Sequence, residues 1–327
     1  MQSGLIDNEP HVAPEFHPAW WLRNPHLQTM WPSRFRHRQK LPLSKERLEL
    51  PDGDFLDLAW MPDSNDDVCL VLHGLEGSLA SHYPAGLIQA AANSHKHAVF
   101  MHFRGCSGEP NRLPRRYHSG ETGDLRFVVE TIKQRYPDKL IHVVGVSLGG
   151  NVLLKFLGEY GADSMLETAI AISVPYDLAV AGQTLDIGTA KLYQRHLLNS
   201  LQATFAEKVK LMELPIRIPE KHEIDTIYKF DDLITAPIHG FKGADDYYTQ
   251  CSSRQFIPDI KTPTLLIHAI DDPFMTPEVI PVKSELPPAV EMDLQPHGGH
   301  VGFIYGNVPL NANYWLDERV ESYLRAC

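Results

Sequence analysis

Residues 141–156 read Ile-His-Val-Val-Gly-Val-Ser-Leu-Gly-Gly-Asn-Val-Leu-Leu-Lys-Phe, and they set the architecture of the whole chain. The β-branched run 141–144 predicts a strand that is apolar on both faces, and the leucine spacing over 148–160 predicts a helix. The turn between them contains a G-x-S-x-G pattern around Ser147. Between a strand and a helix, this pattern predicts a sharp turn that lifts the serine hydroxyl clear of the backbone.

The neighbours of Ser147 explain why this turn suits a nucleophile. Glycines two residues to either side let the strand and the helix approach each other without a clash. The helix that follows points its free N–H groups and the positive end of its dipole at negative charge that develops beside the serine. The turn therefore predicts a nucleophilic serine. The alternative interpretation is a tight turn in an α/β protein without catalysis.

Strand and helix patterns alternate on both sides of this turn. Short apolar runs typical of buried parallel strands occur at 68–72, 98–103, 168–173 and 264–268. Helical patterns cover 83–94 and 123–136. Repeated strand–helix–strand units predict an α/β fold in which a mostly parallel, doubly wound sheet has helices on both faces. Residues 47–61 alternate at period two around Pro-Asp-Gly-Asp and predict an antiparallel hairpin.

Two segments fall outside the alternation, within what we expect to be one domain over residues 1–327. The N-terminal extension, 1–46, contains Asn24, which predicts the N-cap of a short helix that stops before Pro32. The insertion 175–260 separates two strands that a single short helix would otherwise connect.

The insertion contains an amphipathic stretch, 191–214, with its apolar residues on one stripe. They are Leu192, Leu197, Leu201, Phe205, Val209 and Met212. This stretch is either a mobile lid over the carboxyl edge of the sheet or an ordinary packed helix. If the stripe is exposed, the protein makes peripheral contact with a membrane; if it is packed, that interpretation fails.

Composition limits the classes of function. Lys and Arg number 30 against 41 Asp and Glu, so the formal charge is −11 over 327 residues, and such a chain repels nucleic acid. The four cysteines form no C-x-x-C pair, which favours reduced thiols in a cytoplasmic protein. We expect no signal peptide at residues 1–10. We also expect no transmembrane segment, because no apolar run approaches the roughly 18 residues that a helix needs to span a bilayer.

A nucleophilic serine needs a base, and the base needs an acid that orients it. In this topology the acid and the histidine follow the serine in that order. The acid is expected just past the strand 264–268, where Asp271 and Asp272 stand side by side. Adjacent residues of an extended segment point in opposite directions, so at most one of the two faces the histidine. The sequence pattern alone does not decide whether Asp271 or Asp272 is the acid.

The histidine is expected in the loop after a short strand at 290–294. Two candidates, His297 and His300, lie among glycines that let the loop turn sharply. His300 precedes an apolar anchor at 301–303 that locks its ring, whereas His297 lacks one. We therefore favour His300 as the base.

A reacting carbonyl also needs backbone donors for its oxygen. The N–H of Leu148, directly after the serine, is the first candidate. The strand 68–72 runs into an H-G-x-x-G turn at the same edge of the sheet, and the N–H of Leu75 in that turn is the second. His73, which begins the turn, is expected to hydrogen-bond the loop rather than act as a base.

We assign no catalytic role to the remaining polar motifs. Loop 104–108 is expected to line the pocket, and the acidic pairs Asp231-Asp232 and Asp245-Asp246 are expected to be solvated. The chain contains no Walker A pattern, no dinucleotide fingerprint and no paired Cys/His spacing typical of zinc sites. We therefore expect neither a cofactor nor a metal.

Several motifs together resemble one known family. They are Asn24-Pro-His-Leu-Gln-Thr29, His73-Gly-Leu-Glu-Gly-Ser78, Phe103-Arg-Gly-Cys-Ser-Gly108, His118-Ser-Gly-Glu-Thr-Gly-Asp124, Gly145-Val-Ser-Leu-Gly-Gly-Asn151, Phe230-Asp-Asp-Leu-Ile-Thr-Ala-Pro237 and His297-Gly-Gly-His-Val-Gly-Phe303. The combination resembles the AB hydrolase 4 family, the bacterial YheT-like hydrolases and their eukaryotic lipase and acyltransferase relatives. The resemblance implies an α/β-hydrolase fold and hydrolysis of carboxylic esters. It also favours Asp272, because the acid of such enzymes stands immediately before Pro or Arg.

These inferences combine into one expected function. Ser147 attacks the carbonyl of a small-molecule ester with a short- to medium-chain acyl group, His300 takes its proton, and Asp272 holds the imidazole. One alternative is acyl transfer to an alcohol through the same acyl-enzyme. Another is a non-catalytic binding protein with the same fold.

Overall fold

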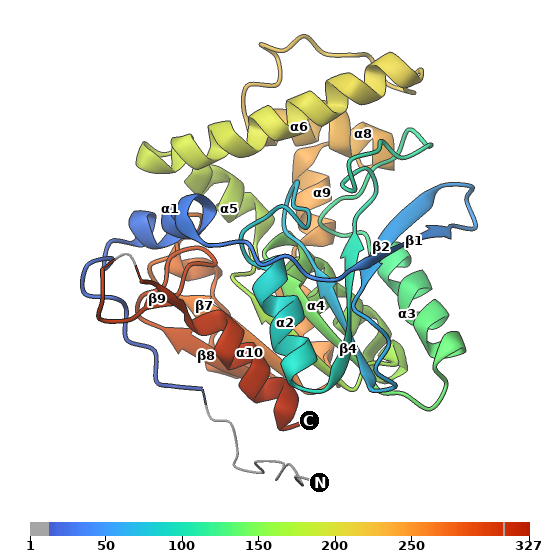
Figure 1. Ribbon diagram of the computed structural model, residues 1–327. Coiled ribbons are helices and arrows are strands. Elements are labelled where there is room, and N and C mark those ends of the chain that lie inside the picture. The colour runs from blue at the N-terminus through green and yellow to red at the C-terminus, as the bar shows by residue number, and fades with distance from the viewer. Residues whose placement is uncertain (1–12, 310) are drawn as a thin grey trace, which may run out of the picture.

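The centre of the molecule is an eight-stranded sheet in the order β1-β2-β4-β3-β5-β6-β7-β8 (Figure 1). A computed structural model describes residues 13–309 and 311–327. The strands are β1 (Ser44–Glu49), β2 (Phe55–Trp60), β3 (Asp67–Leu72), β4 (Lys96–His102), β5 (Ile141–Val146), β6 (Thr168–Ile172), β7 (Thr264–Ala269) and β8 (Val290–Gln295). The expected absence of a signal peptide concerns residues 1–10, which lie outside the described residues.

From β3 onward helical elements connect the strands, and α1 and α10 lie toward the two ends of the described chain. Those that pack around the sheet are α2 (Pro84–Asn93), α3 (Gly123–Arg135), α4 (Leu148–Tyr160) and α10 (Trp315–Arg325), and α1 (Pro25–Phe35) packs on the loop 298–304. Those between β6 and β7 are α5 (Leu178–Leu185), η2 (Gly188–Ala190), α6 (Lys191–Leu211), α7 (Ile227–Phe230), η3 (Asp231–Thr235), α8 (Ala236–His239), α9 (Ala244–Cys251) and η4 (Ser253–Asp259).

The strand pairing confirms the predicted doubly wound fold. β1 and β2 form the expected antiparallel hairpin, and β2 pairs antiparallel with β4. Every other neighbouring pair from β4 to β8 is parallel. The strands β4, β5, β6 and β7 are buried at every position, which is why their sequences are apolar on both faces.

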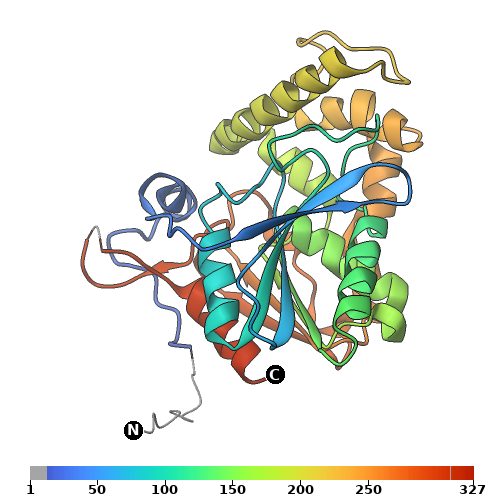
Figure 2. The same ribbon diagram turned by 45° about the vertical axis from the view of Figure 1, so that its right-hand side comes forward.

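Two layers of helices cover the sheet (Figure 2). On one face α2 and α10 pack together, with Leu87 and Val320 in the core beneath them. On the other face lie α3 and α4, whose Val129 and Leu153 belong to a second apolar core. Because both layers hold the sheet rigidly, the loops at the carboxyl ends of its strands have fixed positions.

The chain between β6 and β7 extends over the carboxyl edge of the sheet. We call residues 178–239, which form α5 to α8, the cap; α6 crosses the top of the molecule in Figure 1. Of the rest of the segment 175–260, α9 packs on α5, η3 and α8, and η4 packs on α4. There Asn151 Nδ2 donates to Cys251 O at 2.8 Å, and Ser253 N–H donates to Asn151 Oδ1 at 2.9 Å.

The apolar stripe of α6 is packed inside the cap. Leu201 and Phe205 are buried against residues that include Phe230 and Ile234. Of the stripe, Leu192 alone is a strongly exposed large side chain, at 63%. The stripe therefore does not present a surface to a membrane. Among the described residues, the helices are all too short or too polar to span a bilayer.

One local prediction, the end of the N-terminal helix, was wrong. The helix at the N-terminus does not stop before Pro32 but continues as α1 to Phe35. Pro32 cannot donate to the carbonyl of Gln28, and Gly302 packs closely on that carbonyl, since a Cβ on Gly302 would lie 2.4 Å from it.

Candidate active site

Ser147 stands on the turn between β5 and α4, where the pattern predicts it. Its backbone has φ 52° and ψ −118°, a strained conformation for a residue with a side chain. Glycines on both sides allow the close packing that holds this strain. A Cβ on Gly145 would lie 2.6 Å from Gly149 O, and a Cβ on Gly149 would lie 2.5 Å from His73 O. The predicted need for glycine at these two positions is confirmed.

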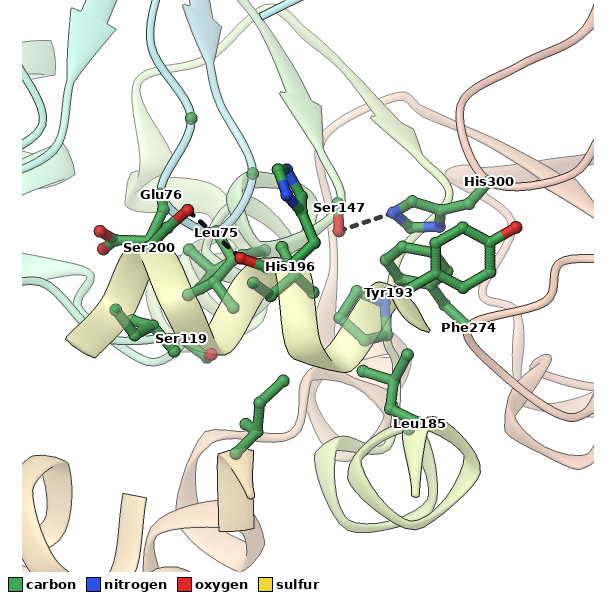
Figure 3. Close-up of a pocket in the computed structure, with 18 of the residues that line it drawn as sticks. Leu75, Glu76, Ser119, Ser147, Leu185, Tyr193, His196, Ser200, Phe274 and His300 are labelled. Carbon is green, nitrogen blue, oxygen red and sulfur yellow. Dashed lines mark hydrogen bonds between the residues drawn. The ribbon is translucent and has the colours of Figure 1, made fainter. Parts of the chain in front are cut away.

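Two hydrogen bonds connect Ser147 to loops at the far end of the chain. His300 Nε2 lies 3.1 Å from Ser147 Oγ, and His300 Nδ1 lies 2.8 Å from Asp272 Oδ2. Asp272 follows β7 and is 3% exposed, so its carboxylate meets the imidazole away from solvent. Figure 3 shows the Ser147 and His300 side chains pointing toward each other. The structure therefore brings together three residues that lie far apart in the sequence.

The neighbouring pair, Asp271 and His297, forms a separate contact. Asp271 Oδ2 lies 3.1 Å from His297 Nδ1, and the His297 side chain is half exposed. Asp271 Oδ1 also accepts the N–H of Gly299 at 2.9 Å. The two adjacent aspartates thus face two different histidines. The segment is a turn and not the expected extended chain, because the Asp272 N–H donates to Ala269 O at 3.1 Å.

An aromatic stack lies against the His300 imidazole. Phe274 is nearly parallel to it, with ring centroids 4.0 Å apart and an interplanar angle of 5°. Tyr193 of α6 also packs on Phe274, with ring centroids 4.9 Å apart, so a cap residue reaches the site (Figure 3). Sequence reasoning missed both rings. Their spacing along the chain carries no signal, because the stack forms only when the cap closes over the sheet.

The two predicted backbone donors lie beside Ser147. Leu148 is the first residue of α4, so its N–H has no partner within the helix. Leu75 follows Gly74, which lies against the serine, since a Cβ on Gly74 would be 3.2 Å from Ser147 Cβ. Within the described residues the Leu75 N–H donates no hydrogen bond. Both groups are therefore free to donate to a bound oxygen.

The loop that carries Leu75 is held from both sides. The Gly74 N–H donates to the Tyr83 hydroxyl at 2.8 Å, and the Glu76 N–H donates to the Tyr117 hydroxyl at 2.7 Å. His73 Nδ1 lies 2.7 Å from Gly74 O, which confirms that this histidine hydrogen-bonds the loop. Burial lowers the pKa of His73 to about 3, so the ring is neutral.

A pocket of about 680 Å³ opens at Ser147, between the sheet edge and the cap. Apolar side chains from the cap form much of its wall. They are Leu178, Ala181, Leu185, Leu197, Leu201, Ile227, Phe230 and Ile234. A cavity of this size and polarity suits an apolar small-molecule group.

A buried polar cluster closes another part of the pocket wall. Glu76 Oε1 accepts hydrogen bonds from Arg116 Nη2 and from the Tyr117 hydroxyl, each at 2.8 Å. Glu76 Oε2 accepts from the Thr204 hydroxyl of α6, also at 2.8 Å. The loop that carries the Leu75 N–H is thereby fastened to the cap.

Loop 104–108, expected to line the pocket, does not do so. Instead, Arg104 is buried and its guanidinium donates to both oxygens of Asp124, at 2.7 and 2.6 Å, and to Asp54 Oδ2 at 3.1 Å. The reason is electrostatic. A buried guanidinium needs carboxylate partners, and these hold the loop against the body of the protein.

Asp231, expected to be solvated, lies in the pocket wall instead. Its carboxylate accepts the Tyr248 hydroxyl at 2.8 Å and the Thr235 hydroxyl at 2.7 Å. Burial raises the pKa of Asp231 to about 6. The prediction failed because the tyrosine comes from α9, and spacing alone does not reveal such a partner.

The chain supplies serine, aspartate and histidine in that order, each from a loop at the carboxyl end of a parallel strand. This order and this edge of the sheet define the α/β-hydrolase class of protein. The sequence profile described as alpha/beta hydrolase fold matches residues 68–307, and the chain belongs to this family.

Relatives of known name place the chain within the AB hydrolase 4 group. It is 45% identical over 323 residues to the Escherichia coli (strain K12) protein named "Putative esterase YheT", covering 97% of this chain and 95% of the relative. It is 27% identical to the Mus musculus protein named "Phospholipase ABHD3", covering 98% of this chain and 81% of the relative. The resemblance found in the motifs is confirmed.

Solved structures share the fold at low sequence identity. The Pyrococcus furiosus esterase Pf2001 superposes with a TM-score of 0.52 at 19% identity, covering 90% of this chain and 91% of that one. Est1E from Butyrivibrio proteoclasticus, solved with ferulic acid bound, gives 0.53 at 14% identity, covering 85% and 97%. At these identities the likeness concerns the fold alone.

Proposed function

We propose that the protein is a serine hydrolase that cleaves carboxylic esters through an acyl-enzyme. The observation that carries this proposal is the chain of hydrogen bonds from Ser147 Oγ through His300 to Asp272, at 3.1 and 2.8 Å. A serine hydroxyl is a weak nucleophile unless a base removes its proton as it attacks. Here the imidazole is within reach of that proton, and the buried carboxylate orients the imidazole.

The first half of the reaction transfers the acyl group to the enzyme. Ser147 Oγ attacks the carbonyl carbon while His300 Nε2 accepts its proton. The carbonyl oxygen becomes an oxyanion that the N–H groups of Leu75 and Leu148 stabilise, each donor contributing about 3 kcal/mol. The imidazolium then gives the proton to the alkoxide, the C–O bond breaks, and the alcohol leaves.

The second half releases the acid. Water takes the place of the alcohol, His300 accepts one of its protons, and the hydroxyl attacks the acyl carbon. The same two N–H groups stabilise the second oxyanion. When the intermediate collapses, His300 returns the proton to Ser147 Oγ and the carboxylic acid leaves.

The pocket supports a small ester with a short- to medium-chain acyl group. Its volume is about 680 Å³, and the cap side is lined by leucine, isoleucine and phenylalanine side chains. Burial of methylene groups there contributes about 0.8 kcal/mol each. The relatives named as an esterase and a phospholipase are consistent with an ester substrate.

The test replaces the nucleophile. Ser147→Ala is expected to lower kcat on 4-nitrophenyl butyrate by more than about a thousandfold while the melting temperature stays close to that of the wild type. A fluorophosphonate probe should label the wild-type protein at Ser147 and leave the variant unlabelled. Near-normal turnover by Ser147→Ala would reject the proposal, and absence of labelling in the wild type would favour a non-catalytic binding protein.

A second measurement separates hydrolysis from acyl transfer. With ethanol added to the reaction, hydrolysis yields the free acid as the main product. Acyl transfer to an alcohol yields the ethyl ester in its place, and product analysis by mass spectrometry distinguishes the two.

A further inference from the structure

The helix α1, which begins in the Asn24-to-Thr29 motif, packs against the loop that carries His300, yet the proposed reaction does not use it. Asn24 caps this helix, because its Oδ1 accepts the N–H groups of His26 and Leu27 at 2.9 and 3.2 Å. One turn further on, the Thr29 hydroxyl oxygen accepts the backbone N–H of His300 at 2.9 Å.

The Thr29 hydroxyl is itself held in one orientation. It donates to Pro25 O at 2.8 Å while it accepts from His300, so both of its hydrogen-bonding roles are fixed. Thr29 is only 9% exposed, which leaves little water to replace either bond. The hydroxyl therefore fixes the point where the His300 backbone lies.

The other end of the same loop is fastened by Gln28. Its Nε2 donates to Leu22 O and Ile304 O, each at 2.9 Å, and its Oε1 accepts the Ile304 N–H at 2.6 Å. Gln28 is fully buried. Thr29 and Gln28, which are neighbours in α1, thus hydrogen-bond the loop 298–304 at two positions, His300 and Ile304.

The loop needs such support because its backbone is strained. Val301 and Phe303 have φ values of 56° and 44°, which side chains rarely adopt. The approach of α1 is also very close, since a Cβ on Gly299 would lie 2.6 Å from Pro25 O and 2.7 Å from Thr29 Oγ1. A strained conformation of this kind persists only where the surroundings hold it.

We propose that Thr29 is a positioning residue for His300: its hydroxyl holds the backbone of the strained loop so that the imidazole meets Ser147 and Asp272. This inference rests on the proposed function. The helix α1 also contacts the aromatic residues beside the His300 ring. His26 Nδ1 lies 3.0 Å from the hydroxyl of Tyr193, and Tyr193 packs on Phe274. Thr29 also lines the pocket, but its hydroxyl is engaged with Pro25 O and the His300 N–H. We therefore expect loss of the hydroxyl to lower turnover rather than substrate binding.

The test compares three variants. Thr29→Val keeps the shape of the side chain and removes the acceptor, and we expect kcat to fall about tenfold with KM within about twofold, since a displaced catalytic group slows the step it serves. Thr29→Ser restores the hydroxyl and should return kcat to within about threefold of the wild type. The control is Thr131→Val on α3, whose hydroxyl makes the equivalent bond to Phe127 O at 2.8 Å far from the site; its kinetics should match the wild type.

Several results would overturn the positioning role. One is a kcat for Thr29→Val within twofold of the wild type. A second is a Thr29→Val variant in which KM rises and kcat is unchanged. A third is a Thr29→Ser variant with a kcat as low as that of Thr29→Val. If Thr29→Val does not fold, Thr29→Ala and the rate of fluorophosphonate labelling of Ser147 give the same comparison. Ser147→Ala keeps the two proposals apart: if it is inactive while Thr29→Val is fully active, only the positioning role fails, and if it is active, the proposed function fails.

Discussion

The sheet edge and the cap meet at one pocket but are held together in different ways. In the sheet, β5 is buried at every position and packs between two apolar layers. In the cap, α6 leaves Leu192 and Leu211 more than 60% exposed and is fastened to the body by polar contacts. Thr204 donates to Glu76, and Lys208 donates to Asn111 Oδ1 at 2.5 Å.

This difference assigns different tasks to the two regions. A close-packed sheet positions side chains at its edge to within a fraction of an ångström, which is what proton transfer between a serine and a histidine demands. The cap, which lies outside the layers that pack on the sheet, determines the shape of the pocket, and we expect its walls to tolerate changes of side chain. Substitutions at the edge should therefore change the rate on every ester, and substitutions in the cap should change which ester reacts.

The largest expected effect is at the sheet edge. Asp272→Asn removes the negative charge that holds the His300 imidazole in the productive orientation, and kcat should fall by about a thousandfold to ten-thousandfold on all esters. Asp271→Asn is the matched control at the adjacent position. It keeps the Oδ1 atom that accepts the Gly299 N–H, so its kcat should stay within about tenfold of the wild type. Steady-state kinetics of both variants measures this. A larger loss of kcat for Asp271→Asn than for Asp272→Asn would mean that Asp271 is the acid.

A smaller and more selective effect is expected in the cap. Gly182 lines the pocket, and a Cβ added there meets only Tyr248 atoms at 3.8 and 3.9 Å, so a side chain at this position extends into open space. Gly182→Leu should lower kcat/KM for a decanoate ester at least about tenfold and leave a butyrate ester within about twofold. A series of 4-nitrophenyl esters of increasing chain length measures this.

The control for that series is Gly182→Ala, which adds one methyl group and should behave like the wild type. Replacing glycine inside α5 also raises helix propensity by about 1 kcal/mol, so neither variant should unfold at a lower temperature. Equal losses on short and long esters would show that the acyl group does not bind against α5.

The same contrast explains which features the sequence could predict. The strands β5, β6 and β7 were predicted within one or two residues, because burial on both faces produces a continuous apolar run. The glycines around Ser147 were predictable because steric exclusion acts between neighbours in the chain. Both features depend on residues that are close together in the sequence, and the structure of the sheet agrees with them.

Features that depend on distant partners were missed. Arg104 was expected at the pocket and is buried among three aspartates, and Asp231 was expected in solvent and is bonded to a tyrosine of α9. Phe274 and Tyr193 gave no signal, because they meet only when the cap lies over the sheet. Buried polar contacts of this kind depend on tertiary geometry, which no spacing along the chain encodes.

The smallest expected effect concerns the polar attachment of the cap. Lys208 is 1% exposed, and its Nζ donates to uncharged acceptors, Asn111 Oδ1 at 2.5 Å and Arg115 O at 3.4 Å. Burial, with a further contribution from the positive charge of Arg116, lowers the pKa of Lys208 to about 7. The folded protein therefore holds this amine neutral at pH values where the unfolded chain keeps it charged.

The sign of the resulting pH dependence follows from this difference. Between about pH 7 and pH 10 the unfolded chain binds a proton that the folded chain does not, so the free energy of unfolding rises with pH. Raising the pH from 6 to 8.5 should stabilise the wild type relative to Lys208→Met by up to about 2 kcal/mol, or about 3 °C in melting temperature. Lys210→Met, on the exposed side of the same helix, should show no such relative shift. If the melting temperatures of Lys208→Met and the wild type instead change with pH in the same way, the Lys208 amine keeps its charge in the folded protein. The cap is then held there by a charged hydrogen bond.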